Sequence, residues 1–129
     1  MTTHSLRVMG EQVELNCLVY GEVPASRYIF MVSVSPDKRI NHLKREIREC
    51  EPSMPSAREM VLYIPKETIT TCPADEFNNA IGRIEFDADL QELSPTEQIS
   101  NYESLSSPSL DELHIIVVLL SEYRTSRLK

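Results

Sequence analysis

The stretch that decides the fold is SPDKRINHLKREIREC, at residues 35–50. Ile40, Leu43 and Ile47 recur three and four positions apart, so they form one apolar stripe of an α-helix whose other positions are mainly polar or charged. No other segment predicts a helix of three turns as convincingly. The strongly apolar segments elsewhere are therefore expected to be strands of a sheet that packs against this helix.

The residues around this helix carry signals for both of its ends. Ser35 or Asp37 is expected to accept hydrogen bonds from the first free N–H groups, with Pro36 in the first turn. At the other end, Pro52 disfavours helical backbone angles at Glu51. We therefore predict a helix that is capped by its own local side chains and stops before the proline.

Four apolar segments flank this helix and are predicted to be strands. Residues 13–20 and 28–34 form an antiparallel hairpin around a loop at 21–27. Residues 59–64 form a third strand that Pro65 ends. The run at 113–120 is almost continuously apolar, which is typical of a central strand covered on both faces.

The segment between the third and the last of these strands carries weaker signals. Its predicted elements are a short strand at 68–71, a short helix at 73–81, a short strand at 90–93, a helical turn at 96–102 and a polar loop at 104–108. The helical turn is expected to place Ile99 and Tyr102 in the core.

The order of these elements predicts an α+β fold with a mixed sheet packed on one main helix. The most economical arrangement is a β-grasp, in which the first and last strands lie parallel at the centre and the helix crosses between them. Residues 1–12 are expected to be a flexible N-terminus, 13–120 the folded domain, and 121–129 a basic tail or the start of a linker.

Bulk composition narrows the classes of function. The 129 residues carry a formal charge of −7, which argues against strong nucleic-acid binding because that needs a positive surface. The apolar run at 115–120 is too short to span a membrane, and residues 1–9 lack the apolar core of a secretory signal. An odd number of cysteines, three, predicts reduced thiols, with Cys17 buried.

Signals for catalysis, metals and cofactors are weak. His4, His42 and His114 lie far apart in the sequence and share no ligand spacing. Cys17 and Cys72 have no adjacent histidine or acid, and three glycines leave no phosphate-binding loop. We therefore expect no enzyme activity and no cofactor.

Two basic pairs, at 38–39 and 44–45, lie on or next to the predicted helix. Their spacing loosely resembles a nuclear-import signal, but an ordinary solvated helix face, with acidic residues interleaved, explains them more simply. Arg45 and Arg48 share the face opposite Ile40 and Ile47. Together with Lys38 they form our candidate partner-binding set.

Three blocks of the sequence resemble the N-terminal header domain of Crinkler (CRN) effectors of oomycetes and fungi. The first block, NHLKREI at 41–47, is similar to the D-x-L-K-x-x-I helix of that family. The second block contains Leu62, Tyr63, Ile64, Pro65 and Lys66, and it is similar to the family's L-F-L-A-K motif. The third begins at Leu113 and contains His114, Ile115, Ile116, Val117 and Val118, similar to the closing H-V-L-V-V-V segment.

Two positions depart from the family pattern. Pro65 replaces the alanine of L-F-L-A-K, and Leu119 and Leu120 stand where the closing segment runs into proline. The looser motif is more similar to fungal members. Residues 91–102 and 113–117 also resemble the last third of ubiquitin.

The resemblance implies a non-catalytic, ubiquitin-like header at 13–120, secreted and delivered into host cells, frequently to the nucleus. Its partner would be a host protein or a second copy of the chain. A rival hypothesis is an intracellular, cytoplasmic β-grasp adaptor, of the Ras-binding or ubiquitin-like kind, that pairs a strand edge with its partner. The strand at 62–66 is treated as such an edge. The last residues, 126–129, lack a diglycine, so conjugation through this end is not expected.

Overall fold

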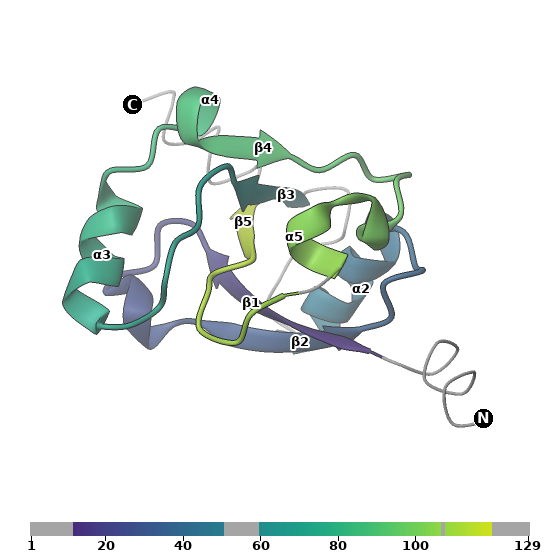
Figure 1. The fold of residues 1–129 in the computed structure, drawn as a ribbon, viewed down its shortest axis with the longest axis horizontal. Coiled ribbons are helices and arrows are strands. Elements are labelled where there is room, and N and C mark those ends of the chain that lie inside the picture. The colour runs from purple at the N-terminus through teal and green to yellow at the C-terminus, as the bar shows by residue number, and fades with distance from the viewer. Residues whose placement is uncertain (1–11, 51–59, 107, 120–129) are drawn as a thin grey trace.

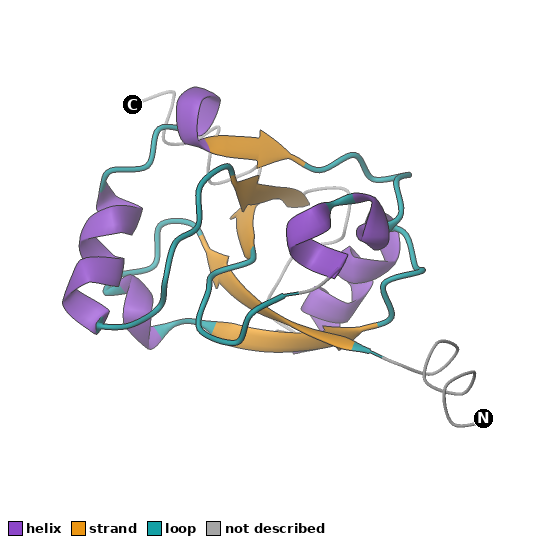
Figure 2. Cartoon of the chain, in the orientation of Figure 1, coloured by secondary structure: helices purple, strands orange, loops and turns teal. Residues whose placement is uncertain are grey.

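A computed structural model describes residues 12–50, 60–106 and 108–119, which form one sheet with helices on both of its faces (Figure 1, Figure 2). The elements are β1 (Val13–Val19), η1 (Ala25–Arg27), β2 (Phe30–Val34), α2 (Ile40–Cys50), β3 (Met60–Pro65), α3 (Ala74–Gly82), α4 (Phe86–Asp89), β4 (Leu90–Glu92), η3 (Ile99–Asn101), α5 (Glu103–Ser106) and β5 (Ile115–Leu119).

The five strands are ordered β2-β1-β5-β3-β4. The first and last strands are parallel, with Cys17 opposite Ile115, and the other neighbouring pairs are antiparallel. The predicted α+β class, the mixed sheet and the central position of the last strand are therefore confirmed. Parallel β1 and β5 at the centre also agree with the expected arrangement.

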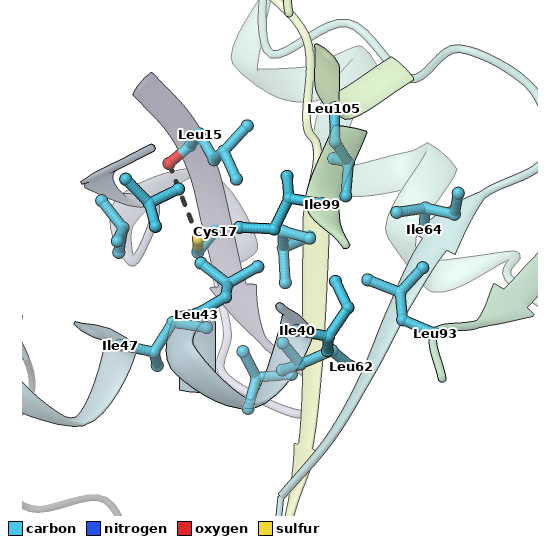
Figure 3. Packing of buried hydrophobic residues seen from close by; sticks show 14 of the residues in the cluster. Leu15, Cys17, Ile40, Leu43, Ile47, Leu62, Ile64, Leu93, Ile99 and Leu105 are labelled. Atoms are coloured by element: carbon cyan, nitrogen blue, oxygen red, sulfur yellow. Dashed lines mark hydrogen bonds between the residues drawn. The ribbon is translucent and has the colours of Figure 1, made fainter. Parts of the chain in front are cut away.

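The first face of the sheet is covered by α2, η3 and α5 (Figure 3). Ile40, Leu43 and Ile47 are fully buried there, so the predicted stripe of α2 forms the centre of this layer. Leu62 of β3 and Ile99 of η3 pack into the same cluster. The placement of Ile99 in the core by a helical turn is thus as expected, and Tyr102 packs against it from a half-buried position.

The second face is covered by α3 together with η1 and the segment at 66–71. Phe77 of α3 is buried against Leu18 of β1 and Ile116 of β5. Ser26 fixes the position of α3, since its backbone N–H donates to the Asn78 side chain at 2.8 Å. The weakly signalled helix at 73–81 therefore forms, and it supplies a second apolar layer.

The start of α2 differs from the prediction. The helix begins at Ile40, and Pro36 lies in the preceding turn. The Ile40 N–H donates to the carbonyl of Glu97 at 2.9 Å, and the Asn41 N–H donates to the carbonyl of Pro95 at 3.0 Å. Backbone carbonyls of a segment distant in sequence thus accept from the first two N–H groups of α2. The expected cap by the side chain of Ser35 or Asp37 is therefore wrong.

Three further predictions need correction. The segment at 104–108 is not simply a polar loop, because α5 forms there and buries Leu105. Pro65 is the last residue of β3 and lies inside the strand rather than after it, because it pairs with Leu90 of β4. For the same reason the strand at 62–66 is not a sheet edge, since it lies between β5 and β4. The predictions for residues 1–11 and 121–129 fall outside the described residues.

Candidate functional site

The predicted partner-binding cations are exposed. Lys38 lies in the turn before α2, and Arg45 and Arg48 lie one turn apart on its outer face. The backbone of Lys38 is fixed, because its carbonyl accepts from the Ile99 N–H at 2.8 Å. Among the described residues, none of the three cations has a carboxylate within 4.0 Å. All three are therefore available to an acidic partner.

The prediction that both basic pairs lie on a solvated helix face is wrong for Lys44. Its side chain is only 7% exposed, because position 44 falls inside the buried stripe of α2. Burial lowers the pKa of the Lys44 ammonium, and the negative charge of Glu92 opposes that shift. The aliphatic stem of Lys44 thus covers apolar surface, and this cation does not belong to the exposed set.

The block that resembles L-F-L-A-K is largely structural. Leu62 and Ile64 are buried in the first apolar layer, and Tyr63 packs against the second. Pro65 is half buried, and only Lys66 is exposed. The Lys66 Nζ lies 3.4 Å from a carbonyl oxygen of Asp87, so this cation sits where β3 meets α4.

The closing block at 114–118 is buried and joins β5 to β1. His114 is 2% exposed, and its Nδ1 accepts from the Asn16 N–H at 2.8 Å. In return the His114 N–H donates to the Asn16 carbonyl at 3.0 Å. The Asn16 side chain donates to the carbonyls of Leu110 and Glu112, each at 2.8 Å, so it secures the loop before β5.

These bonds determine the protonation state of His114. An Nδ1 that accepts a hydrogen bond carries no proton, so the ring is neutral with its proton on Nε2. Nε2 is buried without a hydrogen-bond partner in the described part of the chain. Burial lowers the pKa of His114, while the Ser109 backbone and the Glu112 carboxylate act in the opposite direction. The residue is thus held neutral by its position between the two central strands.

The cysteines and the other metal-binding residue types lie apart. Cys17 is buried with its Sγ 3.6 Å from the Leu15 carbonyl, and burial raises the pKa of its thiol (Figure 3). Cys50 and Cys72 are exposed, and no disulfide joins any of the three. Within residues 12–50, 60–106 and 108–119, no three His, Cys, Asp or Glu side chains gather as a metal site would require. No helix in that part is long and apolar enough to cross a bilayer.

A groove that the sequence did not reveal lies between the segment at 66–70 and α3. It consists of two adjoining hollows of about 350 and 360 Å³ that share Thr68, Ile69, Ala80 and Arg83. Neither periodicity nor a motif marks these residues. The sequence carries no pattern for this groove, because the groove forms only when the segment at 66–70 lies beside α3.

Fold and surface define a small α+β domain whose candidate sites are exposed cations and a groove. The family model described as "Crinkler effector protein N-terminal domain" matches residues 13–118. The chain therefore belongs to this family, and the resemblance stated from its three blocks is confirmed. No curated protein matches the chain.

One solved structure with a similar arrangement is the Hsp90 co-chaperone Cns1 C-domain from Saccharomyces cerevisiae. The match covers 93% of this chain and 68% of that one, at 13% identity and a TM-score of 0.45. At that level of similarity it adds nothing to the functional argument.

Proposed function

We propose that this chain is the non-catalytic, ubiquitin-like header of a secreted Crinkler-type effector, mediating delivery into host cells or interaction within them. The observation that carries the proposal is the family match over 13–118. The β-grasp assignment is supported by the order β2-β1-β5-β3-β4, with parallel central strands and α2 following the first hairpin. The host nucleus is the proposed destination.

We assign the contact with the delivery partner to the exposed cations Lys38, Arg45 and Arg48. Exposed charges at the rim of an interface mainly steer encounter, and their reversal alters association strongly. The protein carries a net charge of −7, so three exposed cations that have no carboxylate within 4.0 Å among the described residues stand out against its background. The partner is therefore a protein with an acidic surface.

The test is reporter localisation. The full chain is fused to an inert fluorescent protein, and host cells are imaged with the parent and with the triple variant Lys38→Glu, Arg45→Glu, Arg48→Glu. We expect delivery to be lost in the variant while the melting temperature stays within a few degrees, because exposed substitutions shift stability by only about 0.5 kcal/mol.

A matched control compares Arg45→Glu with Arg27→Glu, which makes the same charge change at an exposed position in η1. Delivery should fall for the first variant and persist for the second. Delivery that survives the triple reversal would remove the face of α2 from the proposal. A parent fusion that never leaves the producing cell would remove the delivery role itself.

The second candidate is an intracellular β-grasp adaptor in the cytoplasm. It is favoured by one observation: β2 lies at the edge of the sheet and exposes 51% of Met31. An unpaired strand edge can accept a strand from a partner. Localisation separates the two candidates, since an adaptor stays in the cytoplasm of its own cell after infection.

A further inference from the structure

The backbone around Thr70 is paired on one side only. The Ile69 carbonyl accepts from the Leu113 N–H, and the Thr71 N–H donates to the Asp111 carbonyl, both at 2.8 Å. In an extended chain the polar groups of successive residues point to opposite sides. The N–H and C=O of Thr70 therefore point away from Leu113, and they have no partner among the described residues.

The unpaired side of this segment borders the groove. In Figure 1 the chain leaving β3 runs down between the loop before β5 and helix α3. The loop before β5 forms backbone hydrogen bonds with the side of this segment that faces away from α3. Ala80 of α3 and Arg83, which directly follows α3, form the opposite wall, and Thr68 and Ile69 belong to both hollows. The groove thus has an open backbone edge on one side and a helix on the other, which is the geometry of strand addition.

The charges along the groove favour an acidic occupant at its centre. Arg83 lines both hollows, is exposed, and has no carboxylate within 4.0 Å in the described part of the chain. Lys66 lies at one end. The Asp89 carboxylate lines only the hollow that contains Lys66, where it accepts from the Glu85 N–H at 2.8 Å.

The remaining acids of the groove lie toward its ends. Glu67 lines only the hollow that contains Lys66, and Glu76 lines only the other. A carboxylate at the centre would therefore meet Arg83, with the two glutamates on either side disfavouring further acidic residues. Half-buried Ile69 and Ile84 supply apolar surface for β-branched neighbours.

We propose that the groove between the segment at 66–70 and α3 binds an extended peptide of a partner protein. The peptide adds as a strand to the backbone of Thr70 and places one acidic side chain against Arg83. At about 3.3 Å per residue, four or five peptide residues would match the length of the segment. The inference goes beyond the proposed function, because peptide capture would serve a header and an adaptor alike.

The test uses two fluorescein-labelled octapeptide pools with blocked ends, built from valine, isoleucine and threonine and differing only in a central Glu or Lys. Binding to the full chain is measured by fluorescence anisotropy. We expect the Glu-centred pool to bind at least tenfold more tightly, and Arg83→Glu to reverse that preference. Arg27→Glu, the same change outside the groove, should leave it unaltered.

Backbone pairing is tested without altering the protein. The Glu-centred pool is resynthesised with alternate N-methylated amides, which remove the donors of one strand edge, in both alternations. One alternation should lose at least tenfold in affinity while the other binds normally, and the Thr70 amide should shift in the NMR spectrum only with a binding pool. Equal binding of the Glu- and Lys-centred pools, tolerance of both alternations, or an unmoved Thr70 amide would each overturn the inference. None of these results depends on delivery.

Discussion

The two faces of the sheet are covered by helices that differ greatly in how clearly the sequence predicts them. The face under α2 uses a helix with three fully buried apolar residues at regular spacing, Ile40, Leu43 and Ile47. The face under α3 uses a helix whose buried residue is Phe77 alone, with the half-buried Ile81 packed beside it. A regular stripe is visible before folding, whereas a single aromatic anchor is not.

The central strand β5 belongs to both faces. Ile115 and Val117 pack into the layer under α2, whereas Ile116 and Val118 pack into the layer under α3. Successive residues of a strand point to opposite sides, so an apolar run of this kind requires two covered faces. The apolar run of β5 therefore predicts that a second layer covers the sheet. The sequence of α3, which forms that layer, is much harder to recognise because it has a single fully buried residue.

The largest effect is expected from a charge placed under α2. Leu43→Asp buries an unpaired carboxylate at a site with no solvent access, at a cost of several kcal/mol, comparable to the whole stability of a domain of this size. We expect loss of the cooperative unfolding transition in thermal melts followed by circular dichroism. Asn41→Asp, exposed on the same helix, is the control and should melt like the parent. A normal melt for Leu43→Asp would contradict the helix assignment.

A smaller but still large effect is expected on the other face. Phe77→Ala leaves a cavity and should destabilise the domain by about 3–5 kcal/mol in urea unfolding. Asn79→Ala, exposed on the same helix, should change little. A cost near zero for Phe77→Ala would show that the layer under α3 is not part of one cooperative unit with the layer under α2.

Protonation of His114, the buried residue directly before β5, should make the free energy of unfolding depend on pH. Its pKa is lowered in the folded chain, so the unfolded chain binds the proton more readily. The stabilising contribution is complete above about pH 6.5, the unfolded value, and declines as the pH falls from there toward the lower folded pKa.

The measurement is the free energy of unfolding at several pH values for the parent and His114→Asn. The parent should lose up to about 1.4 kcal/mol per pH unit more than the variant in that window. Asn is chosen because its Oδ1 corresponds in position to the histidine Nδ1, so it can accept from the Asn16 N–H without titrating. Parallel curves for the two proteins would show that protonation of His114 is not coupled to unfolding.

The smallest effect concerns the thiols, which should react without any change in stability. Cys50 and Cys72 are exposed and should react with a thiol reagent in the native protein, whereas buried Cys17 should react only after unfolding. The expected count is two fast thiols and three in denaturant. A single thiol in denaturant would reveal a disulfide.

Much of the frame could be predicted from local pattern. The stripe of α2, the first hairpin and the apolar run of β5 follow from side-chain periodicity, which reports directly which face of an element is apolar. The exposure of Lys38, Arg45 and Arg48 followed from the same stripe, since they lie off it. The family's three blocks were likewise recognisable in the sequence alone.

Contacts between distant segments decided the rest. Carbonyls at 95–97, not Ser35 or Asp37, satisfy the start of α2, and the sequence gives no sign that they approach it. Lys44 is buried because other parts of the fold cover its position on α2, although a lysine side chain is normally exposed to solvent. The groove beside Thr70 appears only when the loop before β5 takes one side of that segment and α3 stands across from the other. Periodicity fixes which way a side chain faces, and tertiary packing fixes what it meets there.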